Sequence, residues 1–107
     1  MTKFLYSYRM AVNYQPGRPQ AVEAWRAFFE SLGANLVDPG NPVFESGALG
    51  ITGNGSVRLG GYSLLTADDL DAAVAMAKGC PALGEGGGVE VGVLTEVYRD
   101  GRLTAPA

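Results

Sequence analysis

The first apolar pattern of the chain is a strict alternation between Phe4 and Val12. Every second side chain in this segment is aromatic or methionine: Phe4, Tyr6, Tyr8 and Met10. Successive side chains of a strand point to opposite faces. The alternation therefore predicts a first β-strand with one face in the core and with Arg9 on the other face.

A helical period replaces the alternation from Gln20 to Leu32. Apolar side chains recur there three and four residues apart: Ala21, Val22, Trp25, Phe28, Phe29 and Leu32. Pro19 suits a first helical turn, where no N–H is needed, and Gly33 suits a left-handed C-terminal cap. This segment predicts one amphipathic helix.

Turn-forming residues mark the middle of the chain. The segment Ala34–Pro42 contains Asp38-Pro39-Gly40-Asn41-Pro42, which predicts an exposed loop. Two strands are expected after it, over Val43–Ile51 and Val57–Thr66. Asn54-Gly55 between them is a strong hairpin signal.

A second helix is expected from Ala67 to about Lys78, where apolar residues again follow the helical spacing. Thr66 is predicted as the N-cap of a capping box, with Asp68 and Asp69 at the positive end of the helix. Gly79 is expected to end the helix.

A last strand is expected over Val89–Val97, between the Gly-rich turn Gly84–Gly88 and a polar tail from Tyr98 to Ala107. The resulting order β-α-β-β-α-β predicts a single α+β domain over residues 1–107. We expect a ferredoxin-like fold with an antiparallel four-stranded sheet and both helices on one face. Because large exposed apolar patches are rare on monomers, we expect a homodimer in which two copies pack their bare sheet faces together.

Charge and hydropathy narrow the range of partners. The 107 residues carry a net charge of −3 and no basic stripe, so we expect no nucleic-acid partner. Lys3 and Arg9 interrupt the apolar run at the N-terminus, unlike in a signal peptide, and no apolar run reaches the ~18 residues needed to cross a bilayer. We therefore expect a cytoplasmic protein without a membrane partner.

The chain contains no histidine, and Cys80 is its single cysteine. These two facts exclude a Ser-His-Asp or Cys-His nucleophile, a usual zinc site, a His-ligated haem and an internal disulfide. We predict no metal and no cofactor. Any catalysis has to rest on carboxylates, tyrosines, lysine or the one thiol.

Four segments form a recognisable combination: the stretch Leu59–Pro81, the last-strand residues Val89-Glu90-Val91, the aromatic first strand and the helix with Trp25-Arg26-Ala27-Phe28-Phe29. Together they resemble the YCII-related family, also called the DGPF-domain family. The resemblance implies a dimeric α/β barrel. It implies no single activity, because the wider superfamily includes monooxygenases, isomerases, haem-handling enzymes and binding proteins.

Two features depart from the family. The Asp-Gly-Pro-Phe motif is missing, and its region is shortened around Gly53–Ser56. A His-Asp pair has been proposed as catalytic in some YCII-like proteins, and a chain without histidine cannot carry it.

An aromatic set on the first strand, the first helix and the third strand is the best candidate for a ligand pocket: Tyr6, Tyr8, Trp25, Phe29 and Tyr62. The alternative is that these side chains form the core and the dimer interface, because an aromatic stripe at helical spacing usually serves packing. Arg9 could bind a ligand carboxylate, or it could pair with Glu23 or Glu96 or extend to the sheet edge.

Three further features favour structural roles. The acidic cluster Asp68, Asp69 and Asp71 favours helix capping over metal binding, since the spacing of a calcium loop is absent. The Gly84–Gly88 segment has no phosphate-binding pattern. Cys80 is expected to be a passive, partly buried thiol.

Three functions follow as hypotheses. The preferred one is a homodimer that binds a small organic, possibly aromatic, molecule between the sheet and the helices. The second is a small cofactor-independent lyase, isomerase or monooxygenase that uses tyrosine and carboxylate groups. The third is a protein-interaction module.

Overall fold

The computed structural model describes residues 1–53 and 55–103. Its main sheet has four antiparallel strands in the order β2-β3-β1-β4. These strands are β1 (Thr2–Ala11), β2 (Leu36–Asp38), β3 (Val57–Ala67) and β4 (Gly88–Val93). The helices are α1 (Pro19–Leu32) and α2 (Leu70–Met76), followed by the short 3-10 helices η1 (Gly33–Asn35), η2 (Ala77–Gly79) and η3 (Pro81–Glu85).

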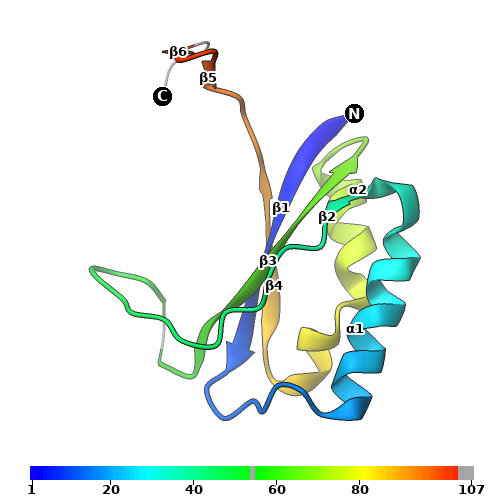
Figure 1. Cartoon of the computed structure of the whole chain (residues 1–107), viewed down its shortest axis with the longest axis vertical. Coiled ribbons are helices and arrows are strands. Elements are labelled where there is room, and N and C mark those ends of the chain that lie inside the picture. The colour runs from blue at the N-terminus through cyan, green and yellow to red at the C-terminus, as the bar shows by residue number, and fades with distance from the viewer. Residues whose placement is uncertain (54, 104–107) are drawn as a thin grey trace.

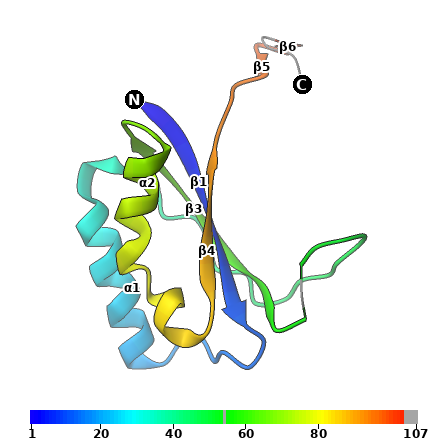
Figure 2. The same ribbon diagram turned by 180° about the vertical axis from the view of Figure 1, so that it is seen from behind.

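Both helices lie on the same side of the main sheet, and none of the described residues forms a helix on the other side (Figure 1, Figure 2). The element order and the strand order are compatible with a ferredoxin-like fold. The prediction of an α+β fold with a four-stranded antiparallel sheet and two helices is confirmed. No helix within residues 1–53 and 55–103 is long and apolar enough to cross a membrane.

Strand β1 lies between β3 and β4 and supplies the centre of the core. Its predicted alternation is confirmed, because all four alternate side chains are buried: Phe4, Tyr6, Tyr8 and Met10. They pack against Phe28 and Leu32 of α1 and against the small residues Ala73 and Ala77. The small side chains let α2 and η2 approach the sheet closely.

Helix α1 begins at Pro19 and ends at Leu32, as the sequence pattern predicts. Gly33 follows with a φ of 55° and donates its N–H to the carbonyl of Glu30. Its ψ of −131° differs from the left-handed helical cap that was expected. The chain turns instead into η1, which leads directly to β2.

The second strand lies earlier in the chain than the sequence pattern predicts. Strand β2 falls inside the segment Ala34–Pro42, which was expected to be a loop, and the predicted strand Val43–Ile51 is irregular. The reason is a long-range anchor: Nδ2 of Asn35 donates to the carbonyl of Thr66 over 2.9 Å, and Leu36 pairs with Leu65. The expected hairpin at Asn54-Gly55 includes Asn54, which lies outside the described residues.

Helix α2 is shorter than predicted, and its N-cap is Asp69 rather than Thr66. Oδ1 of Asp69 accepts a hydrogen bond from the N–H of Ala72 over 2.8 Å. Thr66 pairs with Lys3 in the sheet, so its backbone stays extended. The predicted capping box is wrong because sheet pairing holds this residue.

The C-terminal part also differs from the prediction, in the length of its strand and in the structure of its tail. Strand β4 ends at Val93 rather than Val97. The expected polar tail contains a small hairpin of β5 (Tyr98–Arg99) and β6 (Arg102–Leu103), turned by Asp100 and Gly101 with φ angles of 52° and 78°. Residues 104–107 of the tail lie outside the described residues.

We predict that Asp69→Ala lowers the free energy of unfolding by about 1 kcal/mol, because it removes the one side-chain acceptor at the start of α2. Urea denaturation followed by circular dichroism measures the change. Asp68→Ala is the matched control, since this neighbouring carboxylate makes no hydrogen bond among the described residues. Equal effects of both substitutions would contradict the assigned cap.

Candidate functional site

An open cavity of about 780 Å³ lies between α1, the segment 39–44 and the helix-facing side of β1 and β3. Six aromatic residues line it: Tyr8, Tyr14, Trp25, Phe29, Phe44 and Tyr62. Most of the other lining positions are glycine, proline or aliphatic residues. The cavity is therefore predominantly apolar with a few polar groups, which is the usual composition of a small-molecule site.

Glycines in β3 leave room for the cavity. Gly60 is an extra residue in β3, because Tyr8 pairs with Gly61 whereas Arg9 pairs with Leu59. Gly60 contributes no side chain at this β-bulge, and the side chain of Met10 lies over it. A Cβ at Gly60 would collide with the side chain of Met10, so the position needs glycine.

The segment 39–44 forms the second wall and is anchored to the edge of β3. Gly40, with a φ of 72°, passes so close to the backbone of Tyr62 that a side chain has no space there. The N–H of Val43 donates to the carbonyl of Gly60 over 3.0 Å, and Pro42 forms an isolated bridge with Gly61. These contacts hold the wall in place.

Trp25 is the centre of the aromatic cluster. Its ring lies 4.7 Å from the ring of Tyr8 in an edge-on arrangement and 5.7 Å from the ring of Phe29, measured between centroids. Its indole N–H makes no hydrogen bond among the described residues, and in that part of the chain no fully buried polar side-chain atom lacks a partner. The indole N–H is therefore accessible and free to donate to a ligand.

Tyr8 presents its ring to the cavity but directs its hydroxyl into the core. The hydroxyl donates to Oγ of Ser63 over 2.8 Å, and Ser63 donates to the carbonyl of Pro39 over 2.7 Å. Burial raises the pKa of Tyr8 well above its ordinary value. Because the hydroxyl is protonated and already engaged, Tyr8 is poorly suited to act as a general base.

Four of the six residues predicted as ligand-binding candidates line this cavity: Tyr8, Trp25, Phe29 and Tyr62. Tyr62 shares the face of Ser7 by register, and its hydroxyl accepts from Nδ2 of Asn41 over 3.2 Å. Tyr6 lies outside the cavity, fully buried, with its hydroxyl donating to the carbonyl of Ala73 over 2.5 Å.

Arg9 lies on the bare face of the sheet and not at the cavity. Among the described residues no ion pair joins it to a carboxylate. Its two proposed partners bind other arginines: Glu23 pairs with Arg26, and Glu96 pairs with Arg99.

Arg58 and Phe44 line the cavity and are absent from the sequence-based candidates. The bulge at Gly60 reverses the alternation of β3, so Arg58 pairs with Met10 on the helix-facing side. Nη1 of Arg58 donates to the carbonyls of Val43 and Leu59 over 2.8 and 3.1 Å. The Gly60-Gly61 pair was the one local signal of such a bulge.

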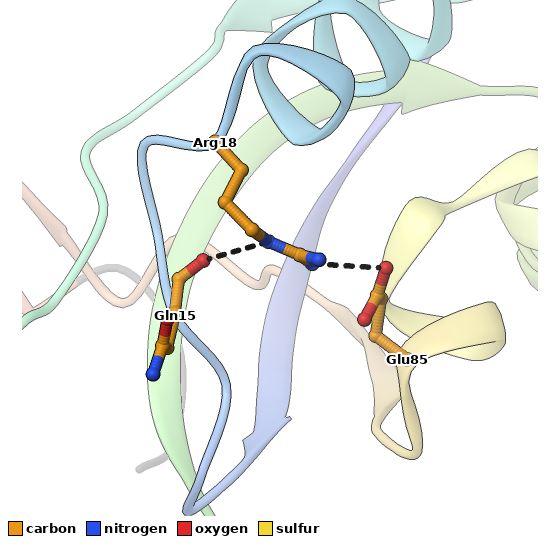
Figure 3. A network of polar contacts seen from close by, with 3 residues as sticks. All are labelled: Gln15, Arg18 and Glu85. Carbon is orange, nitrogen blue, oxygen red and sulfur yellow. Dashed lines mark hydrogen bonds and ion pairs between the residues drawn. The ribbon is translucent and has the colours of Figure 1, made fainter.

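Three residues near the cavity, Gln15, Arg18 and Glu85, form a network of polar contacts (Figure 3). Arg18 donates from Nε to the carbonyl of Gln15 and from Nη2 to Oε1 of Glu85, both over 3.3 Å. It links the start of α1 to η3, and its guanidinium lies 5.9 Å from the ring centre of Tyr14. Because both charged side chains are largely exposed, the pair orients the segments more than it stabilises them.

The other candidate groups have structural surroundings. Cys80 is buried, and burial raises the pKa of its thiol, which disfavours the reactive thiolate. Asp69 caps α2. Within residues 1–53 and 55–103, no group of three histidine, cysteine, aspartate or glutamate side chains is arranged to hold a metal ion.

Comparison of the chain with models of protein families, with curated proteins and with solved structures gives no match.

We predict that stability falls as the pH rises from about 10 to 12, partly through Tyr6. Burial raises the pKa of Tyr6 from 10.0 to about 12, with Cys80 as a second cause. The unfolded chain therefore loses this proton first, and the stabilisation present below pH 10 is lost as the pH approaches 12. Thermal unfolding at several pH values measures the slope.

Tyr6→Phe should flatten this dependence of Tm on pH, and Tyr98→Phe in the exposed β5 hairpin is the matched control. The same slope in Tyr6→Phe and in the unmodified protein would show that Tyr6 does not carry the effect.

Proposed function

We propose that the protein is a homodimer that binds a small, largely apolar aromatic molecule in the cavity between α1 and the sheet. The observation that carries the proposal is the aromatic lining of a cavity of about 780 Å³. Its volume lies within the roughly 300–1,000 Å³ of typical ligand sites.

The lining indicates the chemistry of the ligand. Trp25 and Phe29 offer ring edges and faces for stacking, which favours a flat aromatic molecule. The free indole N–H of Trp25 favours a ligand with one acceptor, such as a carbonyl or phenolic oxygen. Arg58 adds positive charge to the lining, which favours an acceptor with negative charge.

Binding without chemistry is favoured over catalysis. The hydroxyls of Tyr8 and Ser63 are used within the core. Among the described lining residues, Glu30 is the sole carboxylate, and it is exposed to solvent. An acid–base mechanism needs a proton-transfer group held against the substrate, and these residues offer none that is buried and unengaged.

The bare face of the sheet supports the homodimer. By register it carries Leu5, Leu59 and Leu64 beside the polar Ser7 and Arg9. The facing positions of β4 include Gly88 and Gly92, which leave that part of the sheet flat. Two such faces can stack about 10 Å apart around a two-fold axis, as in the dimeric α/β barrel implied by the resemblance to the YCII-related family.

We predict that Val22→Tyr weakens binding of 1-anilinonaphthalene-8-sulfonate, an apolar aromatic probe, by about tenfold. Val22 lines the cavity and is 51% exposed, so a larger ring there fills the site without disturbing the core. Trp25 is the only tryptophan, so energy transfer from it to the probe measures binding, and the comparison of variants locates the site.

Ala24→Tyr is the matched control, because Ala24 is exposed on the same helix and does not line the cavity. Equal affinities of the two variants would show that the probe binds elsewhere. Native mass spectrometry of freshly purified protein then identifies any retained molecule.

We predict that Leu5→Glu raises the dissociation constant of the homodimer at least tenfold, because it places a charge in the sheet-to-sheet interface. Analytical ultracentrifugation over a concentration series measures the constant. Leu70→Glu, at the first position of α2 on the helix side, is the control. The proposal is wrong if the unmodified protein sediments as a monomer or if both variants dimerise equally.

A further inference from the structure

The segment 44–53, called the arm below, leaves the sheet after Val43 and extends away from the body of the molecule. Both views show it on the side of the sheet opposite the helices (Figure 1, Figure 2). Beyond Phe44, which lines the cavity, it therefore reaches past the bare face.

The direction of the arm is set where it joins the sheet. At one end the N–H of Val43 donates to the carbonyl of Gly60, and Nη1 of Arg58 donates to the carbonyl of Val43. At the other end the N–H of Val12 donates to the carbonyl of Ser56 over 3.3 Å. These hydrogen bonds hold both ends against the β1 and β3 edges.

The tip of the arm is apolar and lies in water. Leu49 is 95% exposed and Ile51 is 103% exposed, the largest values among the exposed large hydrophobic residues described. Glu45 is the only charged residue of the segment. Leu49 and Ile51, separated by Gly50, are two fully exposed aliphatic side chains on an anchored projection, and exposed apolar patches mark interaction sites.

A second copy of the chain is the occupant that covers the arm and the bare face together. When two sheets stack about 10 Å apart, anything that projects beyond the face of one sheet runs alongside the other protomer. Two-fold symmetry makes the contact reciprocal, so each arm lies against the partner. The bare face also carries charges of both signs, Arg9 and Glu90, which suits packing against an identical face.

The buried area agrees with this arrangement. The strands of the main sheet have 10, 3, 11 and 6 residues. At about 16 Å² per strand residue, the sheet face covers on the order of 500 Å². A stable interface buries about 800 Å² per partner. Leu49 and Ile51, with on the order of 100 Å² of apolar surface each, supply most of the remainder.

We infer that the arm of each protomer clasps the other protomer of the homodimer through Leu49 and Ile51. This inference rests on the proposed homodimer and adds a second contact region to it. Phe44 at the base of the arm lines the ligand cavity, and the rest of the arm is a dimerisation element.

The double variant L49S/I51S tests the inference by analytical ultracentrifugation. We expect its dimer dissociation constant to rise at least tenfold with an unchanged circular dichroism spectrum, since neither side chain packs in the core. V74S/L83S is the matched control, because it removes two partly exposed apolar side chains on the helix side and should leave the constant unchanged.

The possible outcomes distinguish the role of the arm from the homodimer itself. If the unmodified protein and L49S/I51S dimerise with the same dissociation constant, the arm has no role in the dimer, and the sheet-to-sheet dimer still stands. A monomeric unmodified protein overturns both. Thermolysin gives a second readout: cleavage within residues 44–53 should slow at least tenfold above the dissociation constant, and a rate independent of protein concentration overturns the clasp.

Discussion

The structure depends on the burial of the aromatic side of β1. This strand is hydrogen-bonded on both sides, so its backbone groups are satisfied without solvent and its two faces can have opposite characters. Phe4 and Tyr6 bind α1 and α2 to the sheet, whereas Leu5 and Ser7 lie on the side without helices. The cavity and the bare face thus lie on the two opposite sides of β1, which its alternating side chains make different.

The parts of the fold that follow from local periodicity could be predicted from the sequence. The spacing in β1 predicts its buried side chains, and the spacing in α1 predicts the bounds of the helix and three buried residues, Ala21, Phe28 and Leu32. Strand β2 could not be predicted, because it forms where Asn35 and Leu36 meet the far end of β3. The start of α2 was misplaced for the same reason, since pairing with β1 keeps Thr66 extended.

The residues that line the cavity could be predicted from the sequence only in part. The aromatic residues Tyr8, Trp25 and Phe29 could be found as a set because they share the inner side of β1 and α1. Arg58 could not, because a single extra residue at Gly60 reverses the faces of β3 beyond it. Arg9 was a candidate because its guanidinium can bind a carboxylate, but the alternation of β1 places it on the other face, away from the cavity.

The hydrogen-bond chain from Tyr8 through Ser63 to Pro39 has a consequence for the range of ligands. It fastens the outer wall of the cavity to a hydroxyl that is buried in the core. Moving this wall outward leaves a buried hydroxyl without its acceptor, at a cost of about 1–3 kcal/mol. These hydrogen bonds therefore fix the width of the cavity. Under the proposed function, a ligand wider than the cavity has to break them before it can bind.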